Sequence, residues 1–203
     1  MNKQELLHNL KKQGFAEKII EAFAKTKREN FIKHDLERFA YEDIALPIGE
    51  GATISQPSTT AFMLSLLKLH EHQNVLEIGS GCGYVLALIS EIVGKTGKVF
   101  GLELSKKLAE KSKENLKGYR NVSVFNKNGK YGLAAEAPFD RILISASLEK
   151  IPDILFNQLK EEGIIVAPIG SSQVQILTSM KKHENNLLVL ETIPGFIFVP
   201  FVD

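Results

Sequence analysis

The feature that most limits the fold of this chain is a glycine-rich turn between an apolar run and an apolar segment with helical spacing. The run Val75–Ile78 leads directly into Gly79, and Gly81 and Gly83 follow at alternate positions. Glycine adopts a positive φ without a steric penalty. The pattern therefore predicts a strand, a sharp turn and a helix whose N-terminus meets a ligand. The alternative is a tight turn without a ligand, which needs fewer than three glycines.

Short apolar runs alternate with helical segments after residue 74, which predicts crossover units and a mostly parallel sheet with helices on both faces. We expect strands at Asn74–Ile78, Lys98–Glu103, Val122–Phe125, Arg141–Ser145 and Gly163–Ala167. We expect helices at Tyr84–Val93, Ser105–Leu116 and Ile151–Leu159. The tail Val174–Phe201 has two strand-like runs and no helix, so an antiparallel pair should close this α/β sheet.

The N-terminal quarter has a different character. Apolar positions between residues 3 and 27 predict two helices separated at Gly14, and an irregular stretch follows from Arg28 to Thr53. Ser55 is a suitable N-cap for a helix that we expect to reach His70. We therefore expect one domain over residues 1–203, with an N-terminal helical and loop extension (1–56) and a Rossmann-like core (57–203).

Composition narrows the class of protein. The 203 residues are 44% apolar and 24% charged, which excludes a collagen-like or largely disordered chain. The net charge of +1 demands no basic face, so we expect no nucleic-acid or membrane partner. Only one cysteine is present and the five histidines have no ligand spacing, so we expect no disulfide and no metal site. Without a signal peptide or a long apolar run, the expected location is the cytoplasm.

The spacing of the glycines also indicates a ligand class. Dinucleotide sites usually read G-x-G-x-x-G, whereas G-x-G-x-G is typical of S-adenosylmethionine-dependent methyltransferases. Glu103 ends the second predicted strand, where an acid can accept hydrogen bonds from both ribose hydroxyls. The alternative for Glu103 is an exposed acid that caps the helix beginning at Ser105. Cys82 lies near a helix N-terminus, which would make its thiol reactive, unless a small residue is simply required there.

Several further segments carry a family resemblance. In order and spacing the chain resembles the protein-L-isoaspartate O-methyltransferases, and the similarity extends over nearly the whole sequence. The most restrictive segment is T-I-S-Q-P at Thr53–Pro57, just upstream of the glycine turn. The other matching positions are Tyr41, Asp43, Leu46–Gly49, Ala137–Ile142, Ile151, Pro152, Leu155, Gln158, Leu159, Gly163, Pro168, Gly170 and Phe198–Phe201.

The resemblance implies a definite chemistry. It implies methyl transfer from S-adenosyl-L-methionine to the α-carboxylate of L-isoaspartyl residues in damaged proteins, which begins their repair and releases S-adenosyl-L-homocysteine. It further implies that Ser55 is the active-site residue and hydrogen-bonds the incoming carboxylate, the alternative being that Ser55 only caps a helix. The cofactor-binding residues that it implies are Thr53, Ile54, Thr60, Gly79, Ser80, Gly81, Cys82, Gly83, Glu103, Asn128 and Gly129.

One position departs from the family pattern. Where the family usually has Gly-Asp-Gly after the third strand, this chain reads Lys127, Asn128, Gly129. The family's acid accepts a hydrogen bond from the adenine amine, and Asn128 keeps an acceptor of similar shape without the charge. We therefore expect weaker cofactor binding. We expect the chain to be a monomer that acts on isoaspartyl-containing peptides and proteins. Two other functions remain open: a related methyltransferase for another carboxylate or small molecule, and a non-catalytic relative that acts as a binding module.

Overall fold

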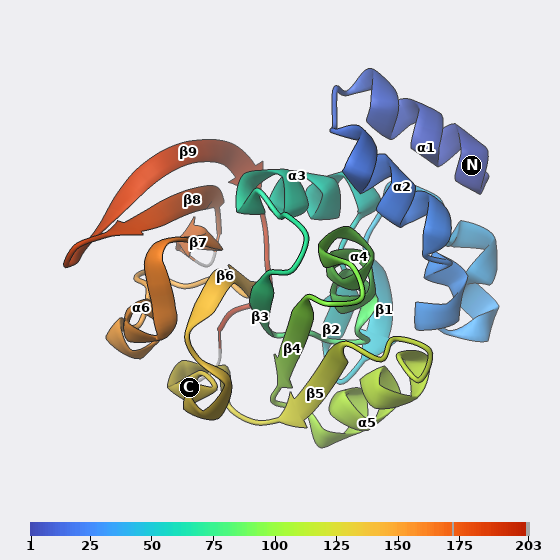
Figure 1. Cartoon of the computed structure of the whole chain (residues 1–203). Helices are drawn as coiled ribbons and strands as arrows, with labels where there is room; N and C mark the ends of the chain where they lie inside the picture. Colours follow the sequence, from blue (N-terminus) through green and yellow to red (C-terminus); the bar gives the residue numbers. More distant parts are fainter. Residues whose placement is uncertain (172, 202–203) are drawn as a thin grey trace.

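The computed structural model describes residues 1–171 and 173–201, so residues 202 and 203 of the expected core lie outside it. Its centre is a seven-stranded sheet in the order β5-β4-β3-β6-β7-β8-β9 (Figure 1). The strands of this sheet are β3 (Asn74–Ile78), β4 (Lys98–Glu103), β5 (Val122–Asn126), β6 (Phe139–Ile144), β7 (Leu159–Gly170), β8 (Gln175–His183) and β9 (Asn186–Phe196). All five predicted inner strands and the predicted C-terminal pair are present.

The direction of the strands also agrees with the sequence prediction. β3 pairs in parallel with β4 on one side and β6 on the other, whereas β8 is antiparallel to both β7 and β9. Chain order thus reverses between β3 and β6, because the chain runs outward to β5 before it returns to the other side of β3. In an open α/β sheet, ligands bind beyond the carboxyl ends of the strands at such a reversal.

The inner strands β3, β4 and β6 are buried on both faces, and alternate residues of each strand point to opposite faces. Val75 packs in the larger apolar cluster, together with the helices on that face, and Leu76 packs in the smaller cluster beneath α6. Helices α3, α4 and α5 lie on one side of the sheet and α6 on the other (Figure 1). The helices are α1 (Lys3–Lys12), α2 (Glu17–Lys25), α3 (Pro57–Leu67), α4 (Tyr84–Val93), α5 (Lys106–Asn115) and α6 (Asp153–Gln158).

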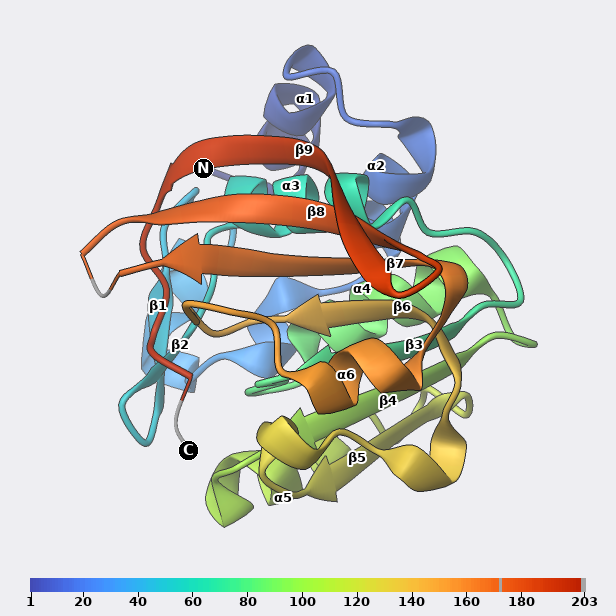
Figure 2. The ribbon, with the colours of Figure 1, turned by 90° about the vertical axis from the view of Figure 1, so that its left-hand side faces the viewer.

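The N-terminal extension packs directly onto this sheet layer. Apolar residues of α1 and α2 belong to the same cluster as those of α3, α4 and the sheet. The stretch from Arg28 to Thr53 is more ordered than we predicted from its sequence. It contains the short helices η1 (Arg28–Phe31) and η2 (His34–Phe39) and, running into Ile54, a hairpin of β1 (Leu46–Gly49) and β2 (Ala52–Ile54), visible beside the main sheet in Figure 2.

Three predicted elements have the wrong bounds. Helix α3 begins after Gln56, not Ser55, and ends at Leu67 because Lys68 adopts a left-handed conformation with φ 49°. Helix α6 is shorter than predicted. β7 begins at Leu159, before the expected Gly163, since the strand extends through an irregular pairing with β6.

Within the described residues, no helix combines the length and the hydropathy that a membrane-spanning segment requires.

Candidate active site

A cavity of about 790 Å³ lies beyond the carboxyl ends of β3, β4 and β6, where chain order reverses. Five of the predicted site residues line it: Thr53, Gly79, Gly81, Glu103 and Gly129. The remaining wall residues are Glu50–Ala52, Ile78, Leu102, Leu104–Leu108, Ser145, Ala146 and Val199–Phe201. The volume is within the range of about 300 to 1,000 Å³ that small-molecule sites usually have.

The glycine turn forms one side of this cavity. Gly79, Gly81 and Gly83 have φ values of 77°, 52° and 87°, a region that other residues rarely adopt. Only the first two face the cavity. A Cβ on Gly83 would lie 2.5 Å from the Ser112 hydroxyl, so Gly83 is required for the packing of α5 against the start of α4.

Glu103 connects the glycine turn to helix α5. One carboxylate oxygen accepts a hydrogen bond from the Gly81 N–H at 2.8 Å, and the other accepts one from the Ser105 N–H at 2.9 Å. The side chain is 9% exposed, so the alternative of an exposed capping acid is wrong. Each oxygen keeps a second lone pair, and Glu103 lines the cavity, so the carboxylate is still able to accept hydrogen bonds from a ligand.

The hairpin formed by β1 and β2 covers part of the cavity. At its tip Gly49, Glu50 and Gly51 all have positive φ values, and this tight reversal brings Glu50 within 3.2 Å of Lys107 on α5. Both side chains are exposed, so the ion pair contributes little stability. The position of this ion pair is more informative, because the pair links the tip of the hairpin to helix α5 on the other side of the cavity.

The C-terminal segment forms another part of the wall. Ser147 donates its N–H to the Val199 carbonyl and accepts from the Phe201 N–H, each at 2.8 Å. Residues more than fifty positions apart are thereby held together beside Ala146 and the cavity. Phe198–Phe201 was part of the family resemblance, but the place of Val199–Phe201 in this wall was not predicted.

Ser55 does not line the cavity; it follows the wall residue Thr53 by two positions. The alternative role of Ser55 as a helix cap is wrong. Gln56 is the N-cap residue, and the carboxylate of Asp43 accepts the Ser58 N–H at 2.8 Å at that helix end. Within the described part of the chain, the Ser55 hydroxyl has no hydrogen-bond partner.

The other predicted site residues lie behind the wall or next to it. Cys82 is buried, and burial raises the pKa of its thiol to about 12, which argues against the alternative of a reactive thiol and favours the expected need for a small residue there. Asn128 adjoins the wall residue Gly129, and its side-chain oxygen accepts the Lys130 N–H at 2.9 Å. The residues that do not reach the wall are Ile54, Ser55, Thr60, Ser80, Cys82, Gly83 and Asn128.

A buried carboxyl group beneath the cavity was missed by our sequence interpretation. Glu77 on β3 is 1% exposed and accepts a hydrogen bond from the Ser145 hydroxyl at 2.8 Å. Burial raises the pKa of Glu77 to about 8. Ser145 itself lines the cavity. It directly follows β6, and this position after a strand was the sequence signal that could have placed Ser145 at the carboxyl edge of the sheet.

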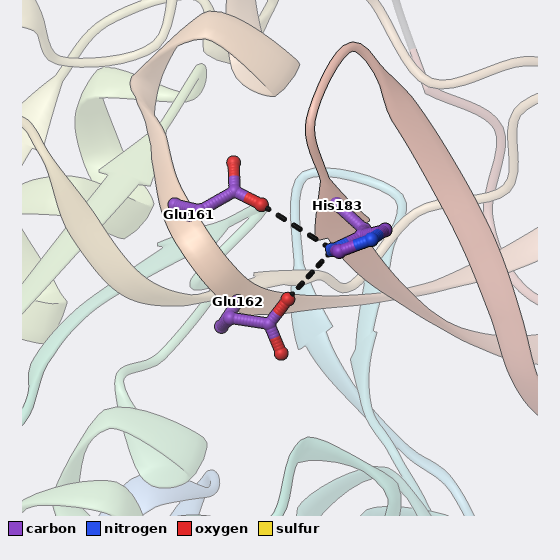
Figure 3. A group of neighbouring side chains, drawn as sticks. All are labelled: Glu161, Glu162 and His183. Carbon is purple, nitrogen blue, oxygen red and sulfur yellow. Dashed lines mark hydrogen bonds and ion pairs between the residues drawn. The ribbon is translucent and has the colours of Figure 1, made fainter.

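Glu161, Glu162 and His183 form a separate exposed cluster at the far end of β7 and β8 (Figure 3). The His183 ring nitrogen lies 3.6 Å from Glu161 and 3.0 Å from Glu162. Glu162 also pairs with Lys181 at 2.6 Å, which lowers the pKa of its carboxyl group. The group is explained as a surface ion-pair network that joins the start of β7 to β8.

Comparison with known proteins gives a consistent result. The family model described as protein-L-isoaspartate(D-aspartate) O-methyltransferase matches residues 1–203. A protein-L-isoaspartate O-methyltransferase of Methanothrix thermoacetophila is 40% identical over 204 residues, covering 100% of this chain and 95% of the relative. One from Petrotoga mobilis is 43% identical over 199 residues, covering 96% of this chain and 92% of the relative.

Solved structures agree with these relatives. A structure named protein-L-isoaspartate O-methyltransferase superposes with a TM-score of 0.92 at 33% identity; the match covers 98% of this chain but 65% of that one. A Plasmodium falciparum protein that carries the same family name, in complex with S-adenosyl-L-homocysteine, has a TM-score of 0.85 at 26% identity, over 100% and 99% of the two chains. The chain described here therefore belongs to the protein-L-isoaspartate O-methyltransferase family.

Proposed function

We propose that this chain transfers a methyl group from S-adenosyl-L-methionine to the α-carboxylate of L-isoaspartyl residues in peptides and damaged proteins. Family membership over residues 1–203 supports the reaction. The structural observation that carries the proposal is the cavity at the reversal of strand order, which combines two backbone glycines with the buried carboxylate of Glu103.

The residues in the cavity fit the nucleoside part of the methyl donor. Glu103 offers its free lone pairs to the two ribose hydroxyls. Leu104 lines the cavity and is 50% exposed, so it supplies an apolar surface that a flat base could cover and remove from water. We propose that Asn128 contacts the edge of the base next to Gly129, by the remaining lone pair of its side-chain oxygen.

Ser55 is proposed to hold the acceptor. Its hydroxyl is free of the helix cap, because Asp43 satisfies the Ser58 N–H instead. The hydroxyl is therefore available to donate a hydrogen bond to the substrate carboxylate. Thr53, two residues earlier, reaches the cavity wall, so the two ends of this short segment serve the acceptor and the methyl donor respectively.

The chemistry needs no general base from the protein. A carboxylate with a pKa near 4 is already ionised at pH 7. When bound, S-adenosylmethionine supplies an electrophilic methyl group. The residues of this chain then hold the carboxylate in line with that group and exclude water from between them, which contributes several kcal/mol through proximity.

We propose in addition that the chain acts as a cytoplasmic monomer with residues 1–203 in one domain. The shared apolar cluster of the extension and the sheet supports the single domain. Light scattering on the purified chain tests the monomer directly.

One experiment distinguishes the proposed function from two alternatives, a small-molecule methyltransferase and a non-catalytic binding module. The chain is incubated with S-adenosylmethionine and an isoaspartyl peptide or a simple dicarboxylic acid, and methyl esters are detected by mass spectrometry. Esterification of the peptide alone supports the proposal, whereas esterification of the small acid alone favours a small-molecule methyltransferase. A non-catalytic module gives neither ester, and thermal melting then shows whether it still binds S-adenosylhomocysteine, since a ligand at 100 times its Kd adds about 2.7 kcal/mol of stability.

A further inference from the structure

Arg28 is a buried charged side chain that the proposed chemistry does not yet use. It begins η1 and is 0% exposed. Among the described residues, no carboxylate forms an ion pair with its guanidinium, and burial lowers the pKa of that group. Burying an unpaired charge costs several kcal/mol, so the partners of the guanidinium should reveal why it is there.

Those partners are three backbone carbonyls. One terminal nitrogen, Nη1, donates to the Ala40 carbonyl at 2.7 Å. The other, Nη2, donates to the Ile44 carbonyl at 3.1 Å and to the Ser55 carbonyl at 2.9 Å. The planar guanidinium can reach several acceptors at fixed angles, which a lysine ammonium cannot do in the same way. Arg28 therefore fixes the backbone of Ser55 relative to the segment that precedes β1.

Arg28 also lies over the residue that follows the glycine turn. Its guanidinium lies 5.9 Å from the centre of the Tyr84 ring. Tyr84 is 2% exposed and is the first residue of α4, directly after Gly83. Arg28 thus links the Ser55 carbonyl to the first residue of α4, which directly follows the glycine turn.

We propose that Arg28 is a positioning residue that fixes the Ser55 backbone relative to the glycine turn and so orients the Ser55 hydroxyl toward the substrate carboxylate. This deepens the proposed function and rests on Ser55 contacting the acceptor. Displacement of a reacting group by about 1 Å can cost about a hundredfold in rate. Loss of the Ser55 carbonyl contact should therefore impair methyl transfer much more than cofactor binding.

The test is a double-mutant cycle with Arg28→Lys and Ser55→Ala, assayed for kcat and KM with an isoaspartyl peptide. Calorimetry with S-adenosylhomocysteine provides the binding readout. We expect Arg28→Lys to lower kcat/KM at least tenfold while the Kd for S-adenosylhomocysteine changes less than threefold. In the Ser55→Ala background, the same substitution should lower kcat/KM less than threefold, because the hydroxyl that it positions is already gone.

Arg141 provides a matched control. Its guanidinium also binds backbone carbonyls, those of Leu67 and Lys68 at the other end of α3 and that of Asp140. Arg141→Lys should lower the melting temperature, and its effect on kcat/KM should be the same with and without Ser55→Ala. Arg28→Gln, which removes the buried charge, replaces Arg28→Lys in the cycle if the lysine variant does not fold.

The outcomes distinguish the two levels of the proposal. If the losses from Arg28→Lys and Ser55→Ala multiply, Arg28 has only a structural role and the inference is overturned while the proposed role of Ser55 stands. If Ser55→Ala alone retains full turnover, the role of Ser55 in the proposed function fails, and the positioning role of Arg28 fails with it.

Discussion

Glu103→Gln tests the connection between the glycine turn and helix α5. The carboxylate of Glu103 accepts one N–H on each oxygen, from Gly81 at 2.8 Å and from Ser105 at 2.9 Å. A glutamine amide can accept only one of them, and its NH2 group would face the other N–H. The substitution therefore removes one charge-assisted hydrogen bond and leaves a buried donor without a partner.

The size of the effect follows from that geometry. A hydrogen bond to a charged group contributes about 1.5 to 3 kcal/mol. In a chain of this length, 1 kcal/mol changes the melting temperature by about 2 to 4 °C, so the variant should melt about 3 to 12 °C lower. Loss of the ribose contact should raise the Kd for S-adenosylhomocysteine about tenfold to a hundredfold, since about 1.4 kcal/mol corresponds to a factor of ten.

Scanning calorimetry and titration calorimetry measure the two effects separately. Glu110→Gln on α5 is the control, because the one ion-pair partner of this exposed carboxylate among the described residues is Lys106 at 3.9 Å, and the substitution should change neither quantity measurably. A Glu103→Gln protein with the melting temperature and the Kd of the wild type would refute the reasoning. A lower melting temperature with an unchanged Kd would refute the ribose contact alone.

Two further predictions concern residues around the turn. Gly83→Ala should destabilise the fold by more than about 1 kcal/mol, because its Cβ would lie 2.5 Å from the Ser112 hydroxyl at a φ of 87°; Gly118→Ala, in open space, should melt like the wild type. For Glu77, burial raises the pKa from 4.5 to about 8, so the folded state binds more protons than the unfolded state between these values. Wild-type stability should therefore fall as pH rises from about 5 to 8, by up to about 1.4 kcal/mol per unit, and Glu77→Gln should remove this slope in melting curves. Parallel pH profiles for the two proteins would contradict it.

The sheet could be predicted because its buried strands are short apolar runs bounded by turns and helices. Two residues at strand ends could be interpreted from the sequence alone: Gly79, which follows β3, and Glu103, which is the last residue of β4. The role of Glu103 in bonding Gly81 could not be predicted, since it depends on the crossover bringing two strand ends together.

Contacts between distant segments account for most of what was missed. The cap of α3 comes from Asp43, fifteen residues before Ser58, so local capping rules chose Ser55 wrongly. The wall contributed by Val199–Phe201 depends on hydrogen bonds to Ser147 that no periodicity encodes. Such pairings are fixed by the packing of the whole chain, which a local pattern does not describe.

The most direct test of the central proposal is methyl transfer to a synthetic isoaspartyl peptide beside its normal aspartyl twin, with the same flanking residues. The free carboxylate of the isoaspartyl linkage is displaced by one methylene, so a site built around Ser55 should align only one of the two acceptors. We expect rapid esterification of the isoaspartyl peptide, little of the aspartyl twin, and a large loss of turnover in Ser55→Ala with S-adenosylhomocysteine affinity retained. Equal esterification of both peptides, or none of either, would contradict the proposed function.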